Sequence, residues 1–201
     1  MEDILSKKEL KEYMAWEGEG RGYTIKLETN YIRRKEGEEG VKKIEEAMTK
    51  VGYPVKYSEV KALQFYPIGV EVLTLLAIKR IFNYGNEEFY DIGASSVKDP
   101  LISRGLFISK SLLSLERIQM AAPGVWDKYY LIGSLSIPEY NKEEKWAVVR
   151  FANFHHHPLN WEIVRGGVIT VFELIYGKKI VCEQTKSIFR GDDCHELIMK
   201  W

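Results

Sequence analysis

The stretch WEIVRGGVITVFELIYGKKIVCEQTKSIFRGDDCHELIMKW (161–201) decides the fold class. From Pro158 to Tyr176, apolar side chains recur every three or four residues, which predicts a helix with one buried face, and Gly177 is a typical helix end. Residues 180–189 and 195–201 favour strands, and the sequence RGDD between them is typical of a turn. Helix, strand, turn and strand in this order indicate an antiparallel sheet at the end of the chain.

The segments that precede this stretch extend the pattern. Residues 135–138 and 146–154 favour strands because they are rich in β-branched and aromatic side chains, and NKEEK (141–145) predicts a hairpin connection between them. Shorter helices are expected at 58–65 and from Pro123 onward. Longer helices are expected in the first half of the chain at 24–35, 41–51, 68–82, 86–97 and 107–121.

Helices followed by a hairpin, a helix and a second hairpin indicate an α+β fold rather than a doubly wound α/β fold. We expect an antiparallel sheet built from the C-terminal hairpins and covered by an N-terminal helical half. Because no repeat, low-complexity segment or clear linker divides the chain, residues 1–201 are expected to form a single domain. Residues 1–21 could be a peripheral N-terminal extension of that domain.

Charge and composition exclude several classes of protein. The chain has 29 Lys and Arg against 29 Asp and Glu, and this balance argues against a nucleic-acid-binding protein, whose affinity depends on neutralising phosphates. The most apolar run, 68–82, is interrupted by charged residues and is too short for a membrane span. Two cysteines are too few for a disulfide scaffold. We therefore expect a cytoplasmic protein that binds no nucleic acid.

No phosphate-binding loop, hydrolase nucleophile motif or zinc-protease motif is present in the sequence. The glycines of GEGRG (18–22) lack the rest of a dinucleotide-binding fingerprint, so a flexible turn is the better interpretation. His155, His156 and His157 are consecutive, and neighbours on a strand point to opposite faces. Only His155 and His157 could share a metal, and a polar strand end is the stronger interpretation.

Cys182 and Cys194 lie on the last two predicted strands, where a hairpin could place them opposite each other. With Glu183 and His195 beside them they suggest a zinc-like set, but the close C-x-x-C spacing of such sites is missing. Two buried structural cysteines are the stronger interpretation. We expect no metal ligands and no catalytic residues, although metal binding by these cysteines with His195, or by the histidine run, stays open.

Aromatic residues, at 12% of the chain, are the best guide to function. A domain with this many large side chains can leave an apolar cavity between its sheet and its helices. We expect five aromatic residues on inward faces to line such a ligand-binding pocket: Phe107, Trp126, Phe151, Trp161 and Phe172.

The C-terminal stretch, with its helix, strand, Gly-Asp-Asp-Cys turn and strand, resembles the 4-vinyl-reductase type of small-molecule-binding domain. That group shares its fold with haem–nitric-oxide-binding domains and with vesicle-tethering TRAPP subunits. The sequence is most similar to an uncharacterised bacterial family of the same fold, which has a GEEG-like turn after its first helix and an aromatic last strand. Tyr31, Gly37 and Trp201 carry this similarity, which extends over residues 22–201.

The resemblance implies an α+β domain that encloses a hydrophobic pocket, senses small or gaseous ligands and forms a homodimer. Gly191 and Cys194 match the zinc-containing relatives, but Ser187 stands near the position of their first cysteine. Haem-binding relatives have a histidine on a helix near the middle of the chain and a Tyr-x-Ser-x-Arg signature. Here no histidine precedes His155 and the signature is absent, so no haem is expected.

We therefore expect a non-catalytic ligand-binding or sensory module that holds an apolar or aromatic small molecule in a hydrophobic pocket and needs no cofactor. It would form a homodimer and signal through a separate partner. The first alternative is a protein-interaction or scaffold domain that acts as a dimer. A zinc-containing protein or an enzyme is the less favoured alternative.

Overall fold

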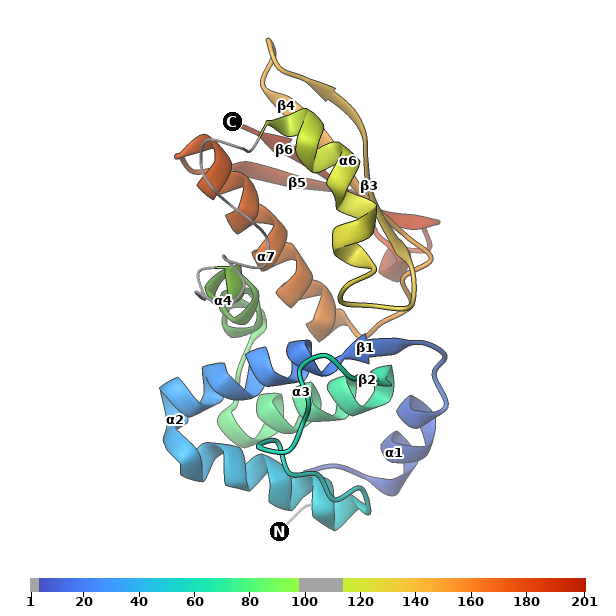
Figure 1. Cartoon of the computed structure of the whole chain (residues 1–201). Coiled ribbons are helices and arrows are strands. Elements are labelled where there is room, and N and C mark those ends of the chain that lie inside the picture. Colours follow the sequence, from blue (N-terminus) through green and yellow to red (C-terminus); the bar gives the residue numbers. More distant parts are fainter. Residues whose placement is uncertain (1–3, 98–113) are drawn as a thin grey trace.

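The computed structural model describes residues 4–97 and 114–201 (Figure 1). The C-terminal strands form one lobe with two helices, and the N-terminal helices form a second lobe beneath it. A short 3-10 turn, η1 (Ile188–Arg190), lies between the last two strands. The other elements, in chain order, are α1 (Lys7–Met14), β1 (Glu19–Arg21), α2 (Gly22–Val51), β2 (Phe65–Pro67), α3 (Ile68–Phe82), α4 (Asn86–Val97), α6 (Leu115–Trp126), β3 (Ser134–Asn141), β4 (Trp146–Ala152), α7 (Pro158–Tyr176), β5 (Val181–Lys186) and β6 (Cys194–Lys200).

The C-terminal lobe is built on a four-stranded antiparallel sheet in the order β3-β4-β6-β5. Its two hairpins join along β4 and β6, where Phe151 lies opposite His195 and Val149 opposite Leu197. Buried and partly exposed side chains alternate along β4, as expected where helices cover one face of a sheet. These helices are α6 and α7. The predicted α+β class and the predicted sheet of C-terminal hairpins are confirmed.

The N-terminal lobe contains α1, α2, α3 and the two-stranded sheet β1-β2, and it lies across the end of the C-terminal lobe at which α7 begins (Figure 1). Every residue from Ile68 to Ile78 is buried, as expected for a helix that is apolar nearly all round. The helices predicted at 68–82, 86–97 and 158–176 are confirmed as α3, α4 and α7.

α2 bends sharply at Gly37, whose φ of 73° and ψ of −175° are not helical. Glycine adopts a positive φ without the steric penalty that a β-carbon brings. The GEEG turn expected from the sequence is therefore a kink inside one long element. The helices predicted at 24–35 and 41–51 are its two arms, and the second arm folds back toward α1 (Figure 1).

Two local predictions in the N-terminal lobe are wrong. The GEGRG segment is not a free turn, because Glu19–Arg21 form β1 and pair with β2, with Glu19 opposite Pro67. Residues 58–65 contain turns rather than a helix, and Phe65 begins β2. Strands of three residues carry little local signal, since their stability comes from the pairing itself.

α6 also departs from its predicted bounds. It runs from Leu115 to Trp126 through Pro123, a residue that was expected to begin a new helix. Proline removes one backbone hydrogen bond from a helix, but the amide of Asp127 still donates to the carbonyl of Pro123 at 3.0 Å and completes the last turn. Residues 107–113 of the predicted helix lie outside the described residues.

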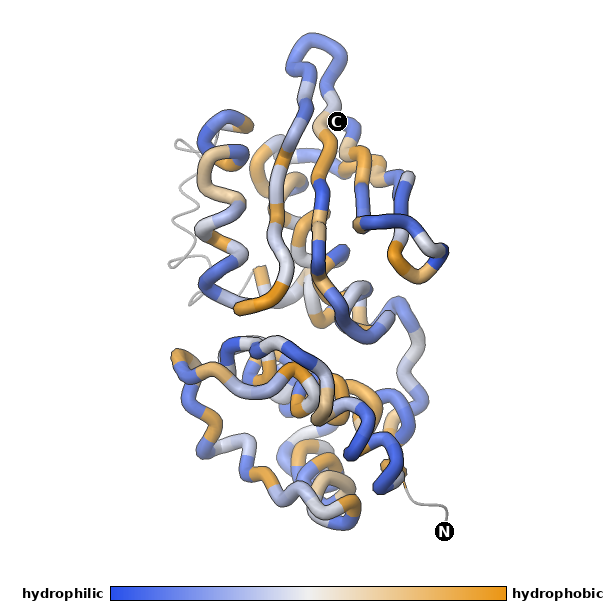
Figure 2. The backbone as a smooth tube through the Cα atoms, turned by 90° about the vertical axis from the view of Figure 1, so that its right-hand side faces the viewer, coloured by the Kyte–Doolittle hydropathy of each residue, from blue (hydrophilic) through white to orange (hydrophobic). Residues whose placement is uncertain are grey.

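The buried apolar side chains form two clusters, one in each lobe. Ile68, at the start of α3, packs into the cluster of the C-terminal lobe, and Leu159, at the start of α7, packs into that of the N-terminal lobe. The β3–β4 hairpin ends in a hydrophilic tip away from both clusters (Figure 2). Within the described part of the chain, no helix is long and apolar enough to cross a lipid bilayer.

Candidate functional site

An apolar pocket of about 310 Å³ lies between α4, α6, α7 and the inner face of β3 and β4. The first turns of α2 also contribute to it. The described residues that line it are Thr24, Leu27, Ser96, Val97, Arg117, Ile118, Ala121, Ala122, Val125, Trp126, Tyr129, Tyr130, Leu135, Ile137, Val149, Phe151, Ile163, Val164, Gly167, Val168, Val171 and Phe172.

α7 supplies the longest wall of the pocket. Val164, Val168 and Val171 follow one another at helical spacing, and Phe172 extends the stripe toward the sheet. Side chains three and four residues apart share one face of a helix. The apolar stripe that predicted this helix from the sequence is thus the surface that faces the pocket.

α4 and α7 approach each other closely beside the pocket because each places a glycine against the backbone of the other. A β-carbon at Gly93 would lie 1.8 Å from the carbonyl oxygen of Ile163, and one at Gly166 would lie 2.1 Å from that of Tyr90. Any larger residue at either position would push the two helices apart. These glycines therefore fix how far apart two walls of the pocket stand.

Trp126, on the last turn of α6, anchors the aromatic end of the pocket. Its ring meets Phe151 at a centroid distance of 5.4 Å and Phe154 at 4.8 Å, both edge to face, which is a favourable arrangement for aromatic pairs. Its indole nitrogen donates to the carbonyl of Ile132 at 3.0 Å. The polar atom of this buried side chain is thus satisfied, and the ring presents an apolar surface.

The structure places three of the five predicted lining residues, Trp126, Phe151 and Phe172, at this pocket. Trp161 lies elsewhere and stacks on the imidazole ring of a β6 histidine at a centroid distance of 3.9 Å. Phe107 lies outside the described residues. The aliphatic residues of the lining could not be predicted from the sequence. An inward valine has the same sequence pattern whether it lies next to a cavity or in a filled core.

A buried glutamate, Glu71 of α3, lies next to the pocket and is held by three donors from other elements. The hydroxyl of Tyr130 donates to its Oε1 at 2.9 Å and the side-chain amide of Asn160 to the same atom at 2.7 Å. The hydroxyl of Thr24 lies 3.0 Å from its Oε2. Because Thr24 and Tyr130 also line the pocket, a ligand there would touch two partners of this carboxyl group.

Glu28 of α2 lies beside Glu71, and apart from a carboxyl–carboxyl hydrogen bond between the two, its carboxyl oxygens have no partner within the described ranges. Burial, and then repulsion from Glu71, raises the pKa of Glu28 well above its usual value. Burial also raises the pKa of Glu71, but the three donors and the hydrogen bond with Glu28 oppose that shift. Glu28 is therefore the member of the pair that holds its proton more firmly.

This glutamate pair joins the two lobes. Glu28 and Glu71 belong to the N-terminal lobe, whereas Tyr130 follows α6 and Asn160 lies on α7. Buried polar networks of this kind favour one relative placement of the elements that supply them, since a displaced donor is left unpaired. The only signal for the pair in the sequence is weak, in that Glu71 interrupts an otherwise apolar helix.

The histidine run does not form the metal pair considered from the sequence. β4 ends at Ala152. His155 is exposed, and His157 caps α7 by accepting from the amide of Leu159 at 3.2 Å. Among the residues that the structure describes, no group of three or more His, Cys, Asp and Glu side chains could hold a metal ion.

The prediction that Cys182 and Cys194 could lie opposite each other is wrong. Cys182 lies opposite Met199 on β6, and Cys194 lies opposite Ala152 on β4, so the two thiols occupy different strand pairs. Both are free, and burial raises the pKa of Cys182 to about 11. Such a thiol stays protonated near neutral pH and is a poor nucleophile and a poor metal ligand.

Solved structures of H-NOX domains share this fold. An H-NOX protein from S. oneidensis in the Fe(II)NO ligation state matches with a TM-score of 0.65 and 12% identity over 90% of this chain and 98% of that one. An oxygen-binding H-NOX domain related to soluble guanylate cyclases, solved as the oxygen complex, matches with a TM-score of 0.62 and 11% identity over 90% and 94%.

A third match, a mutant H-NOX protein from K. algicida in the Fe(II) unliganded state, has a TM-score of 0.65 and 12% identity over 90% of this chain and 95% of that one. No family model matches the sequence, and no curated protein matches it. The chain therefore has an H-NOX-like fold, which confirms the resemblance noted from the sequence. At these identities the likeness concerns the fold alone.

Proposed function

We propose that the apolar pocket binds a small uncharged molecule and that the chain is a non-catalytic ligand-binding or sensory module. The observation that carries this proposal is the composition of the lining. Of the described residues around a cavity of about 310 Å³, Arg117 is the only charged one. Small-molecule sites are typically concave, mostly apolar and upward of roughly 300 Å³, so the pocket lies at the lower end of that range and favours a small ligand.

The fold supports a sensory role. The similar solved structures include an oxygen complex and a nitric-oxide complex of H-NOX domains, so this architecture places small ligands in other proteins. We extend to this chain the binding of a small ligand, and we place that ligand in the apolar pocket between the helices and the sheet.

Haem does not fit the residues of this pocket. Haem iron is held by a His, Cys, Met or Tyr side chain, and the described lining contains no His, Cys or Met. The four histidines of the chain are residues 155, 156, 157 and 195, and none of them lines it. Burial raises the pKa of both lining tyrosines, Tyr129 and Tyr130, so neither readily supplies a phenolate, and Tyr130 also donates its hydroxyl proton to Glu71. We therefore propose a ligand held by apolar contact rather than by a metal.

Ligand binding would be transmitted through the glutamate pair. A molecule in the pocket contacts Thr24 and Tyr130, which both bond to Glu71, and Glu71 joins the lobes. Any shift of the Tyr130 hydroxyl away from Glu71 leaves a buried donor without its acceptor, which is unfavourable by about 1–3 kcal/mol. An apolar ligand can thereby alter the relative stability of two lobe arrangements.

Indole is a suitable probe for this pocket, because it is small, largely apolar and uncharged. We expect indole to raise the melting temperature of the full chain and to perturb NMR signals of residues on α6, α7 and β4. Val168→Phe should remove binding while circular dichroism stays native, because the larger ring fills the cavity. Val181→Phe, on the exposed edge of β5, is the matched control and should bind indole like the parent protein. Indole binding that survives Val168→Phe would refute the proposal.

Homodimer formation and docking to a separate signalling partner stay predictions. Among the described residues, the exposed large apolar side chains belong to different segments, and two of them, Leu131 and Phe189, line one groove. This distribution favours the ligand-binding proposal over the scaffold alternative; the residues are Leu63, Met120, Leu131, Val181 and Phe189. Light scattering of the purified chain over a range of concentrations would decide the oligomeric state.

A further inference from the structure

A second concave surface, of about 970 Å³, lies at the end of the C-terminal lobe away from the β3–β4 hairpin tip, and it shares no lining residue with the apolar pocket. Four connecting segments form it: those between α1 and β1, between α6 and β3, between β4 and α7, and between β5 and β6. We call it the loop groove. Loops held on a rigid scaffold are common positions for binding residues. The side chains that line the loop groove are therefore candidates for ligand binding.

The loop groove contains a buried imidazole with a free lone pair. The Nδ1 atom of His156 lies 2.5 Å from the carbonyl oxygen of Phe154, and since a carbonyl only accepts, Nδ1 carries the proton and Nε2 is an acceptor. His156 is only 4% exposed, and its Nε2 has no hydrogen-bond partner within the described residues. Burial lowers the pKa of His156 to about 3, so the ring is neutral near pH 7 and its lone pair is available.

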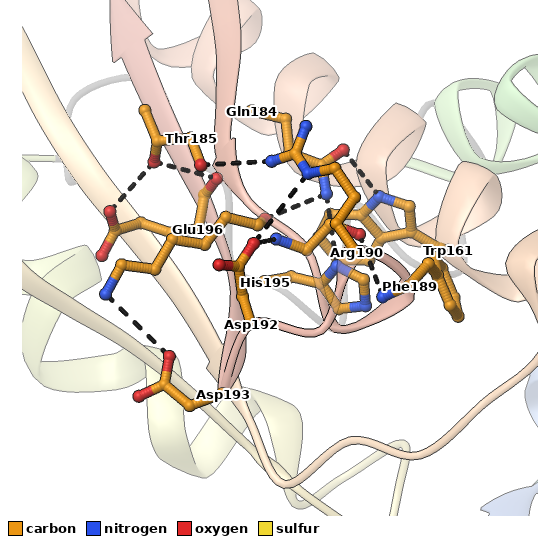
Figure 3. Close-up of polar contacts among 11 residues, drawn as sticks. Trp161, Gln184, Thr185, Phe189, Arg190, Asp192, Asp193, His195 and Glu196 are labelled. Atoms are coloured by element: carbon orange, nitrogen blue, oxygen red, sulfur yellow. Dashed lines mark hydrogen bonds and ion pairs between the residues drawn. The ribbon is translucent and has the colours of Figure 1, made fainter.

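The neighbouring His195 does not satisfy this acceptor, since its own Nε2 is also without a hydrogen-bond partner among the described residues, and it also argues against a metal. Trp161 donates to Oε1 of Gln184 at 3.2 Å, which turns the Gln184 amide nitrogen toward Nδ1 of His195, also at 3.2 Å (Figure 3). Nδ1 of His195 is therefore an acceptor and its Nε2 carries the proton. A metal between the two rings would find only one lone pair, whereas a ligand N–H finds an acceptor on His156.

Carboxylates surround the mouth of the groove. Asp192 and Asp193 follow η1 and lie in its lining, as does Glu17. The ion pairs of the two aspartates, with Arg190 and Lys186, are both long at 3.9 Å (Figure 3). Exposed pairs of this kind are weak, and no lysine or arginine is among the described lining residues. Together with Glu17, the three carboxylates outnumber the two cations paired with the aspartates, so the rim is net negative.

Apolar side chains complete the surface. Leu131 is 57% exposed and Phe189 is 44% exposed, which is unusual for large apolar residues, and both line the groove. The Phe189 ring packs edge-on against the rings of His156 and His195 at 5.4 and 5.0 Å. A ligand that reaches Nε2 of His156 would therefore move the Phe189 side chain aside. The apolar part of the ligand would then pack against the moved ring.

We propose that the loop groove is a second ligand site, which takes a small molecule carrying a protonated amine on an apolar body. The ammonium group donates to Nε2 of His156 and faces the carboxylates of Asp192 and Asp193. The apolar body covers Leu131 and Phe189. A neutral analogue lacks the attraction to the rim, and an anion is repelled by it, so charge sets the specificity.

Benzylamine and benzyl alcohol are matched probes, since they share their shape and differ in charge. We expect benzylamine to bind the full chain about tenfold more tightly than benzyl alcohol, a difference of about 1.4 kcal/mol, and to lose affinity as salt is added. NMR titration should show the largest shifts at Trp16, His156 and Phe189. Equal affinity for the two probes, or shifts confined to other residues, would overturn the proposal.

Two double variants distinguish a specific effect of the rim carboxylates from a general effect of the net charge of the protein. The exposed double substitution Asp192→Asn with Asp193→Asn should weaken benzylamine binding about tenfold. The fold should tolerate it, since the side-chain oxygen of an asparagine can still accept from the Ser187 amide as Asp192 does. The control, Glu59→Gln with Asp127→Asn, removes the same charge at exposed positions outside both sites and should change affinity less than about twofold.

Equal losses in the two double variants would contradict a specific site. Val168→Phe, which fills the apolar pocket, should leave benzylamine binding unchanged. This result would distinguish the loop groove from the apolar pocket, because the two sites share no lining residue.

Discussion

Glu28 shows how a single residue can make stability depend on pH. Its carboxyl group is buried with Glu71 as its one hydrogen-bond partner among the described residues, and its pKa is raised from 4.5 by burial and by Glu71. Between pH 4.5 and the raised value, the folded chain binds more protons than the unfolded chain. The free energy of unfolding therefore falls as pH rises through this interval.

Glu28→Gln should remove this dependence, because an amide keeps the shape of the protonated carboxyl and cannot ionise. We expect the variant to gain stability relative to the parent protein as pH rises from about 5 to about 8, as measured by urea unfolding. Glu46→Gln, an exposed glutamate on the same helix, is the control and should follow the parent protein. A constant difference between Glu28→Gln and the parent protein across this range would show that Glu28 is already ionised in the folded state.

Three histidines, His156, His157 and His195, have the opposite effect on how the free energy of unfolding depends on pH. Burial is the largest cause that lowers the pKa of His156 to about 3 and those of His157 and His195 to about 4, from 6.5. Below pH 6.5 the unfolded chain binds more protons than the folded chain, so these groups reduce stability as pH falls toward 4.

His156→Phe should therefore make the acid side of the stability profile less steep, because it keeps an aromatic ring and removes a titrating group. Urea unfolding at about pH 7 and about pH 5 would measure this change. His155→Gln, at an exposed position, should leave the profile as it is in the parent protein. An unchanged slope in His156→Phe would mean that His156 is protonated in the folded chain.

At the scale of elements, α4 and α7 can cross closely because glycines, which have no side chain, stand at their contact. Gly93→Ala would place a β-carbon 1.8 Å from a backbone oxygen of α7, and the backbone cannot yield as a flexible side chain can. We expect a loss of about 3 kcal/mol or more in the free energy of unfolding and weaker binding of indole, because the two pocket walls separate.

Two glycines on neighbouring helices provide the controls for that substitution. Among the residues that the structure describes, a β-carbon at Gly124 of α6 meets nothing within 4 Å, and one at Gly167 of α7 has its nearest contact at 3.6 Å. Gly124→Ala should be neutral or stabilising by up to about 1 kcal/mol, because alanine is the better helix former. Chemical denaturation of the three variants would show whether the crossing, rather than helix propensity, causes the loss.

The elements that could be predicted from the sequence are those whose signal is local. α3, α4 and α7 have the predicted bounds, because apolar periodicity and end signals such as Gly177 lie within or next to each helix. β1 and β2 could not be predicted, since three-residue strands exist only through their partner. The register that separates Cys182 from Cys194 is set by the η1 turn and an irregularity within β5. The burial of Glu28 arises only when α2 meets α3.

At the scale of the whole molecule, Glu71 joins the lobes. Glu71→Ala would leave the buried hydroxyl of Tyr130 and the amide of Asn160 without their acceptor, which is unfavourable by about 1–3 kcal/mol for each group. We expect the lobes then to unfold separately, so that tryptophan fluorescence and far-ultraviolet circular dichroism report different midpoints. Glu71→Gln keeps an oxygen acceptor and should retain a single transition. Coincident midpoints in Glu71→Ala would mean that apolar contact alone couples the lobes.

The strand order β3-β4-β6-β5 has a consequence for the rate at which the chain folds. The outer pairs are hairpins between neighbours in sequence, whereas the central pair joins β4 to β6 across the whole of α7. Closing such a loop costs chain entropy before any contact forms, and high contact order slows folding. The joining of β4 to β6 is therefore the expected rate-limiting step. A substitution at Val149 or Leu197, in the central pair, should slow refolding more than one of similar equilibrium effect at Leu135, in an outer hairpin.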